Sequence, residues 1–346
     1  MNKEKACNIA RIVFFVLFFI LLIETVSVLF FNEETATKYR HGMKDAYSFV
    51  NDRDNSLQII FVGNSDLYSG ISPLDLWRYQ GFTSTVCASP NQTIGDSTSI
   101  IETFLKFQKP DLVVIEVDML YVGKGKKRNN SFFRIKDLDY YFDRCDPELM
   151  DNAIQDYCSI FRFHNYWKGG KTNKNKPYNL HGYKYTKKVV PLRGFNYMKY
   201  TDKTDPIKRI TEEQTDKLIK LSRENGAEVV LLELPSINSW NYKRHNAMQQ
   251  YADKRKINFV DMNMNIDEIG IDWGTCFRDK SGSHLNYKGA KAATKYLGKY
   301  IADNYYLKSH TGDERYSDWD EDLEMFDFYK KNNKQKQSWG DRPDKE

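Results

Sequence analysis

The chain has 346 residues, of which 40% are apolar and 14% aromatic, so it can build a core and is not a disordered protein. Lys and Arg number 52 and Asp and Glu 47, and the net charge of +5 indicates no particular partner. Five cysteines without paired spacing exclude a Cys-rich zinc module and a disulfide-dense scaffold.

An apolar run lies close to the N-terminus. Residues 12–31 carry a single charge, Glu24. Twenty helical residues span about 30 Å, the thickness of the hydrocarbon core of a bilayer. Three basic residues precede the run, which by the positive-inside rule keeps residues 1–11 in the cytoplasm and exports the remainder. A cleaved signal peptide is the alternative, although its apolar region is usually shorter. We therefore predict a single-pass cell-membrane protein with an uncleaved anchor.

Beyond this run, short apolar stretches alternate with amphipathic ones. Buried strands are expected at residues 57–63, 83–88, 111–117, 227–234 and 257–260. Helices are expected at residues 73–79, 95–108, 211–225, 242–255 and 287–304. This alternation predicts an α/β fold of three layers, with a doubly wound, parallel sheet of five strands. Such sheets bind ligands at the carboxyl ends of their strands, where functional side chains are expected.

The expected α/β domain covers residues 57–307. A polar stretch at 32–56 is predicted to be a short helical stalk, and the charged residues 308–346 a flexible tail. A basic, aromatic insert interrupts the domain at about 122–210. Between positions 159 and 204 it has eleven Lys or Arg against one acid, with ten aromatic residues among them.

Two segments carry candidate catalytic residues. Ser65 follows the first expected strand, where a serine at a strand-to-helix turn has an exposed hydroxyl and a backbone N–H directed into the cleft. His284 lies in a loop before the last expected helix, from which it can reach Ser65 as a general base. Each residue alone has a plainer interpretation, an ordinary turn for Gly63-Asn64-Ser65 and a buried structural histidine for His284.

The two segments together resemble the SGNH (GDSL-type) hydrolase superfamily. The resemblance is narrower to its membrane-anchored members that act on bacterial surface polymers, the D-alanyl-lipoteichoic acid synthesis protein D and the alginate-type O-acetyltransferases. It covers about residues 57–120 and 211–305, and the segments that carry it are 63–73, 109–116, 258–263 and 279–290. It implies an SGNH, flavodoxin-like fold without a cofactor or metal, in which Ser65 is the nucleophile and His284 the base.

The resemblance also implies an oxyanion hole. Besides the N–H of Ser65, the residues at the corresponding positions are Ala88, which contributes its N–H, and Gln92 or Asn91, which contributes a side-chain amide.

The catalytic acid departs from the family pattern. The family commonly has Asp three residues before the histidine, and that position here is Ser281. Asp279, five residues before His284, is the expected substitute, with Asp272 as the second candidate. A Ser65–His284 pair without an acid remains a third possibility.

The basic, aromatic insert has a pattern often found in nucleic-acid binding. Since the predicted topology places it outside the membrane, we expect no nucleic acid and instead contact with an anionic glycan, a teichoic acid or lipid headgroups. The residues expected to bind the polymer are Lys184, Lys187, Lys188, Arg193 and Trp167. A solvated cap over the cleft is the plainer interpretation.

The sequence thus predicts an extracytoplasmic enzyme that moves an acetyl or D-alanyl group onto or off a bacterial surface polysaccharide or teichoic acid through an acyl-Ser65 intermediate. The resemblance implies a membrane-bound O-acyltransferase as partner. The alternative is a non-catalytic module of the same fold that binds or assembles the polymer.

Overall fold

The structure is a computed structural model that describes residues 3–30, 45–121, 179–193 and 196–332. They belong to two compact units, one of which contains α1 (Lys3–Phe30) and the other the remaining described residues from Asp45 onward. Within the described ranges no helix combines the length and the apolarity needed to cross a membrane, so the anchor predicted at 12–31 is not supported. Residues 32–44 of the expected stalk lie outside the described part.

The second unit is built on one parallel sheet of five strands. In chain order these are β1 (Ile59–Gly63), β2 (Ser84–Ala88), β3 (Leu112–Glu116), β4 (Glu228–Glu233) and β5 (Asn258–Asp261). Their order across the sheet is β2-β1-β3-β4-β5, and every neighbouring pair is parallel. The predicted sheet is confirmed, and its strand order is the flavodoxin-like one, in which the order reverses between β1 and β3.

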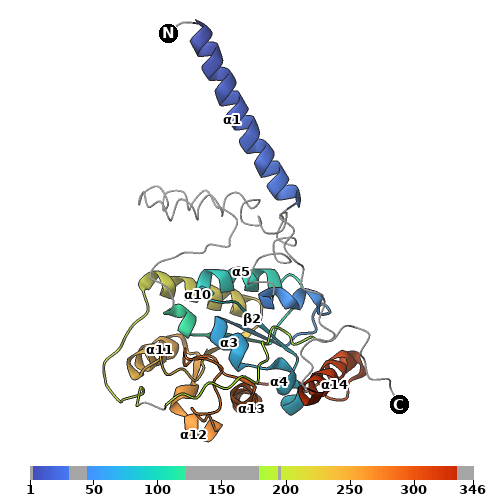
Figure 1. The fold of residues 1–346 in the computed structure, drawn as a ribbon, viewed down its shortest axis with the longest axis vertical. Coiled ribbons are helices and arrows are strands. Elements are labelled where there is room, and N and C mark those ends of the chain that lie inside the picture. The colour runs from blue at the N-terminus through green and yellow to red at the C-terminus, as the bar shows by residue number, and fades with distance from the viewer. Residues whose placement is uncertain (1–2, 31–44, 122–178, 194–195, 333–346) are drawn as a thin grey trace. The chain divides into compact units, whose positions relative to one another are not determined.

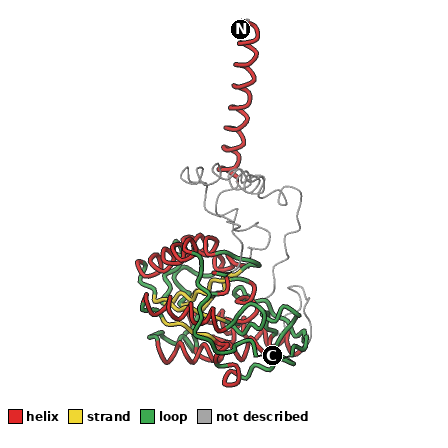
Figure 2. The backbone as a smooth tube through the Cα atoms, turned by 90° about the vertical axis from the view of Figure 1, so that its left-hand side faces the viewer, coloured by secondary structure: helices red, strands yellow, loops and turns green. Residues whose placement is uncertain are grey.

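Helices cover both faces of this sheet (Figures 1 and 2), which makes the three predicted layers. On one side lie α5 (Ile94–Phe104) and α10 (Arg209–Glu224), and on the other α3 (Ser65–Gly70), α4 (Pro73–Gln80) and α13 (Tyr287–Asn304). Two more helices, α11 (Tyr242–Arg255) and α12 (Ile266–Ile269), flank β5 in the chain. The remaining helix of the unit is α14 (Ser317–Asn332), and short 3₁₀ helices occupy 45–51, 118–120, 262–264 and 314–316.

Local sequence signals explain where these helices begin. Ser72 caps α4 by accepting from the N–H of Asp75. Pro73 occupies the first helical position, where an N–H would have no acceptor within the helix, so its missing N–H costs no hydrogen bond. Thr93 and Asp96 cap α5 reciprocally in a capping box. Asn286, two residues after His284, caps α13 and fixes its start at Tyr287.

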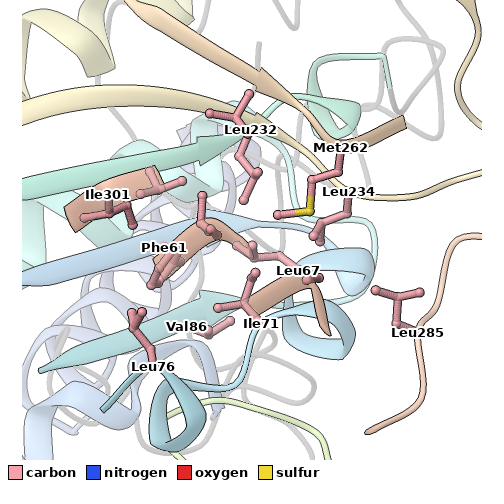
Figure 3. Close-up of a cluster of buried hydrophobic side chains, with 14 of the residues drawn as sticks. Phe61, Leu67, Ile71, Leu76, Val86, Leu232, Leu234, Met262, Leu285 and Ile301 are labelled. Atoms are coloured by element: carbon pink, nitrogen blue, oxygen red, sulfur yellow. The ribbon is translucent and has the colours of Figure 1, made fainter. Parts of the chain in front are cut away.

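The main core lies between the sheet and the layer that contains α3 and α13. Figure 3 shows side chains from different elements meeting there, among them Phe61 of β1, Val86 of β2, Leu232 of β4 and Ile301 of α13. All four are fully buried. Because Leu67 of α3 also packs into this cluster, the core fixes the helix that begins at Ser65.

The folded unit extends beyond the predicted domain at both ends. Phe49 is buried on the N-terminal side and packs edge-to-face on Phe104, with ring centroids 5.0 Å apart. On the C-terminal side, α14 occupies part of the segment predicted to be a flexible tail. Its Trp319 and Phe326 are buried, and the indole of Trp77 donates to Asp320 at 2.8 Å. That prediction is wrong for residues 317–332, because apolar side chains interspersed among the acids pack against α4.

Residues 179–193, one of the two described parts of the basic insert predicted at about 122–210, form an extended strap without regular secondary structure. The strap is tied to the core by backbone hydrogen bonds from Val86 N to His181 O, from Lys184 N to Tyr68 O and from Val190 N to Phe277 O. The strap is therefore an integral part of the folded domain.

His181 is buried where the strap meets α14. Its ring stacks on Trp319 with centroids 3.9 Å apart, Nδ1 lies 3.3 Å from Asp52, and Nε2 lies 3.6 Å from Asp322. Burial alone lowers the pKa of His181, but the two carboxylates outweigh it and raise the pKa to about 9. The strap, α14 and the N-terminal segment thus meet on one charged imidazole.

This ionisation predicts a pH dependence of stability. The pKa of His181 is higher in the folded state than the ordinary 6.5, so its contribution is complete below pH 6.5 and is lost as the pH rises through 9. The free energy of unfolding of the wild type should fall between about pH 6.5 and 9.5 by on the order of 2–3 kcal/mol more than that of the His181→Asn variant, which lacks the imidazole. Urea unfolding of both proteins at several pH values measures the difference, and parallel pH profiles would contradict it.

Candidate active site

Ser65 lies at the carboxyl edge of β1, as the first residue of α3. Asn64 caps this helix by accepting from the N–H of Asp66 at 2.8 Å. The backbone N–H of Ser65 is one of the helix-terminal donors that no turn satisfies, and it has no acceptor among the described residues. The turn thus presents a hydroxyl and a free N–H together, as expected for a nucleophile with its own oxyanion donor.

Close packing beneath the turn fixes the strand end. A Cβ on Gly63 would lie 2.6 Å from Cβ of Glu116 on the neighbouring strand β3. Only a glycine lets the two strands approach in this way. Glu116 in turn accepts from the N–H of Asn64 at 3.0 Å, so the residue before the nucleophile is held by a buried carboxyl group.

An unbroken chain of hydrogen bonds links the three residues predicted to be catalytic. Nε2 of His284 lies 2.8 Å from Oγ of Ser65, and Nδ1 of the same ring lies 2.7 Å from Oδ2 of Asp279. The side chain of His284 is 20% exposed, so part of the imidazole is accessible from solvent. Residues 219 positions apart in the chain therefore form a nucleophile, base and acid in hydrogen-bonding order.

Ser281, three residues before His284, connects Asp279 and His284. Its hydroxyl donates to Oδ1 of Asp279, and its Oγ lies 3.1 Å from Nδ1 of His284. Burial acts to raise the pKa of Asp279, but hydrogen bonds from Ser281 and His284 outweigh it and lower the pKa below its usual value. The carboxylate is therefore ionised at neutral pH, as the partner of a histidine base must be.

The loop that carries these residues is held against the segment after β4. The N–H of Ile237 donates to the carbonyl of Gly282 at 2.9 Å, and the amide of Asn238 donates to the carbonyl of Ser281 at 2.6 Å. Gly282 has φ of +75°, and a Cβ there would lie 2.3 Å from Ile237. This glycine is what allows Asp279 to fold back onto His284 from five residues away.

Asp272, the second candidate for the acid, is used elsewhere. Its two carboxylate oxygens accept from the N–H of Gly274 at 2.9 Å and from the hydroxyl of Thr275 at 2.6 Å. Asp272 caps its own turn and has no contact with His284 among the interactions of the described residues.

The predicted oxyanion-hole residues are only partly available. Ala88 is the last residue of β2 and pairs in register with Gly63, at the same edge of the sheet as Ser65. Asn91 is exposed. Gln92 does not fit its predicted role, because it is buried and its amide donates to the carbonyl of Cys87 at 2.9 Å and to Oγ of Ser97 at 3.0 Å. Both of its donors are thereby committed to the loop after β2.

A buried acid that was not predicted from the sequence lies beside the nucleophile. Oδ1 of Asp66 lies 3.4 Å from Nε2 of His284, and the residue is 4% exposed. Burial, and then the neighbouring Asp118, raises the pKa of Asp66 well above its usual value. The available sequence signal for Asp66 was its position directly after the candidate serine, in the first turn of a helix. Acids are favoured in that turn whatever their function, so the position alone does not indicate catalysis.

Arg278 was also missed, although it precedes Asp279 directly. Its side-chain Nε lies 3.6 Å from Oδ2 of Asp279, and its backbone N–H donates to the backbone carbonyl of His284 at 3.1 Å. A basic residue next to the predicted acid could have been singled out from the sequence.

Of the residues predicted to bind polymer, four are described and Trp167 lies outside the described residues. The ammonium of Lys184 lies 4.0 Å from the centre of the Tyr68 ring, on the helix that begins with Ser65. Lys187, Lys188 and Arg193 are exposed on the strap, where Lys187 donates to the carbonyl of Lys330 at 2.5 Å. The strap thus brings Lys184 to the candidate site and leaves the other three cations on the surface.

Within the described ranges, no group of three or more His, Cys, Asp or Glu side chains could hold a metal ion.

Comparison with known proteins finds similarity only at the level of structure. No family model matches the chain, and no curated protein matches it. A GDSL-like lipase from Bacteroides thetaiotaomicron is 14% identical with a TM-score of 0.35, over 72% of this chain and 90% of the lipase. A lipase/acylhydrolase from Enterococcus faecalis is 13% identical with a TM-score of 0.34, over 73% of this chain and 99% of that one. A family 3 carbohydrate esterase from Clostridium thermocellum has the same identity and TM-score, over 71% and 96%.

Proposed function

We propose that this protein is a serine-dependent enzyme of the SGNH (GDSL) type that hydrolyses an ester or transfers its acyl group. The observation that carries the proposal is the hydrogen-bonded order Ser65–His284–Asp279 at the carboxyl edge of β1. This order supplies a nucleophile, a base within reach of its proton, and an anion that orients the base.

The geometry supports the following reaction. Oγ of Ser65 attacks the carbonyl carbon of the ester while its proton moves to Nε2 of His284. Asp279 accepts from Nδ1–H and stabilises the imidazolium that forms, and the N–H of Ser65 donates to the developing oxyanion. His284 then returns the proton to the leaving alcohol, and the acyl group stays on Ser65. Water or an acceptor hydroxyl reverses these steps and frees the serine.

We further propose that the physiological acyl group is acetyl or D-alanyl and that the acceptor or donor is an anionic polysaccharide or a teichoic acid. The exposed cations Lys187, Lys188 and Arg193 on the strap support an anionic polymer. A membrane-bound O-acyltransferase as the source of the acyl group follows from the family resemblance alone and stays a prediction.

The proposal is tested with 4-nitrophenyl acetate as acyl donor. The wild type should release 4-nitrophenolate in an initial burst of one equivalent per enzyme if deacylation is the slower step, or at a steady catalytic rate if it is not. Addition of a polysaccharide acceptor should accelerate release if the enzyme is a transferase. Release no faster than in buffer would contradict the proposal.

A further inference from the structure

A half-buried arginine next to the candidate site has cationic donors that the fold does not use. The side chain of Arg278 is 18% exposed, and its guanidinium makes no hydrogen bond among the interactions of the described residues. Its side-chain neighbours include Asp279, 3.6 Å away, and the ring of Tyr68, whose centre lies 5.5 Å from Cζ, and its charge also acts on Asp66 and Tyr183. A guanidinium has five donors in a fixed fork, so most of its capacity is open.

Arg255, an arginine of similar burial in the same protein, shows how unusual this is. Its side chain is 14% exposed, and its guanidinium donates to Glu212 at 2.6 Å and to Asp216 at 2.8 Å. The fold thus provides carboxylates for a half-buried guanidinium where the arginine has a structural role. Among the described residues, no carboxylate accepts a hydrogen bond from Arg278, although it directly precedes Asp279 of the candidate site.

Asp279 does not take up the charge of Arg278 by direct hydrogen bonding. Both oxygens of Asp279 are already engaged, Oδ1 by Ser281 and Oδ2 by His284. The distance of 3.6 Å to Arg278 is beyond hydrogen-bond length, so the arginine contributes little to the orientation of the acid. Its fork remains available to another acceptor.

A second cation lies on the same aromatic ring. The ammonium of Lys184 is 4.0 Å from the centre of the Tyr68 ring, and Tyr68 is three residues after Ser65 on α3. Asp66, a buried acid two residues before Tyr68, also interacts with Arg278, whose charge opposes the rise that burial causes in the pKa of Asp66. Two cations, Lys184 and Arg278, thus lie at the ring of Tyr68, three residues after the candidate nucleophile.

We propose that Arg278 is a specificity-determining residue that binds an anionic group of the ester substrate, a carboxylate or a phosphate, beside Ser65. A planar guanidinium binds such groups through two parallel hydrogen bonds, which an exposed surface lysine cannot do. The inference rests on the proposed function and adds to it the requirement that the substrate carry its negative charge close to the scissile ester.

The test compares esters that differ in charge. The neutral ester is 4-nitrophenyl acetate. Mono-4-nitrophenyl succinate places a carboxylate on the acyl side, and 5-acetoxy-2-nitrobenzoate places one on the alcohol side. The readout is the ratio of kcat/KM for each anionic ester to kcat/KM for the neutral one, so that a general loss of activity cancels.

For at least one anionic ester, Arg278→Gln should lower this ratio about 10- to 100-fold, since a charge-assisted hydrogen bond pair is lost. The ester that responds identifies the side on which the substrate carries its charge. Arg278→Lys, which keeps the charge without the fork, should restore part of the ratio. Lys280→Gln is the matched control, because it removes one positive charge from the same loop at an exposed position, and its ratios should stay within about twofold of wild type.

Unchanged ratios in Arg278→Gln would overturn the inference while leaving the proposed function intact. An equal fall in Lys280→Gln would also overturn it, because the effect would then be one of general charge. A wild type that turns over none of the three esters would contradict the proposed function itself, and the inference with it.

Discussion

Replacement of Ser65 or His284 by Ala should lower kcat for 4-nitrophenyl acetate by roughly three to six orders of magnitude. The two groups act as one unit, because the hydroxyl is nucleophilic only while Nε2, 2.8 Å away, accepts its proton. The double variant should therefore be scarcely slower than either single one. Steady-state kinetics of the three variants measure this, with far-ultraviolet circular dichroism to establish that each is folded.

The chain offers a close control for the histidine. His245 is also hydrogen-bonded to a carboxylate, with Nδ1 2.8 Å from Oδ2 of Asp261, but the structure shows no serine hydroxyl bound to its ring among the described residues. His245→Gln should keep activity of the wild-type order, which separates loss of the catalytic base from loss of a histidine–aspartate pair. Wild-type activity in Ser65→Ala, or additive losses in the double variant, would contradict the assignment.

Asp279→Asn should reduce kcat by roughly 10²- to 10⁴-fold without unfolding the protein, as loss of the triad acid does in serine hydrolases. An amide in place of the carboxylate no longer stabilises the imidazolium and no longer fixes the tautomer that leaves Nε2 free to accept from Ser65. The measurement is kcat at neutral pH beside a thermal melt of the same preparation.

Asp272→Asn is the matched control for that variant. Asp272 lies seven residues before Asp279 and accepts only from its own turn, so its replacement should leave kcat close to that of the wild type. A larger effect at Asp272 than at Asp279 would assign the acid to Asp272. Small effects at both positions would mean that His284 works without an acid.

The fold could be predicted from the sequence because its signals are local. β1, β3 and β4 each contain four consecutive apolar residues, and parallel strands buried on both faces have this appearance. The same reasoning located Ser65 and His284, since one follows the first strand and the other precedes α13, and these chain positions meet at one edge of the sheet.

The partners of individual side chains could not be predicted in the same way. Gln92 has the right amide for an oxyanion, but its donors are taken by Cys87 and Ser97, a choice that depends on how the loop folds back. Asp279 reaches His284 from five residues away because Gly282 adopts a left-handed conformation between them. Such selection is a property of tertiary packing, which residue spacing does not encode.

The C-terminal segment shows the limits of composition. Eight acids between residues 313 and 327 suggested a solvated tail, but Trp319 and Phe326 are buried between them and hold α14 on α4. Composition averaged over a segment does not show which of its faces is covered.

The most direct test of the account is the identity of the residue that reacts with an active-site serine reagent. The folded wild-type protein, treated with a fluorophosphonate and digested, should carry a single modification, on the peptide that contains Ser65. His284→Ala should slow this labelling strongly, because the base no longer removes the serine proton. Absence of labelling, or labelling of another serine in preference to Ser65, would contradict the claim that Ser65 is an activated nucleophile.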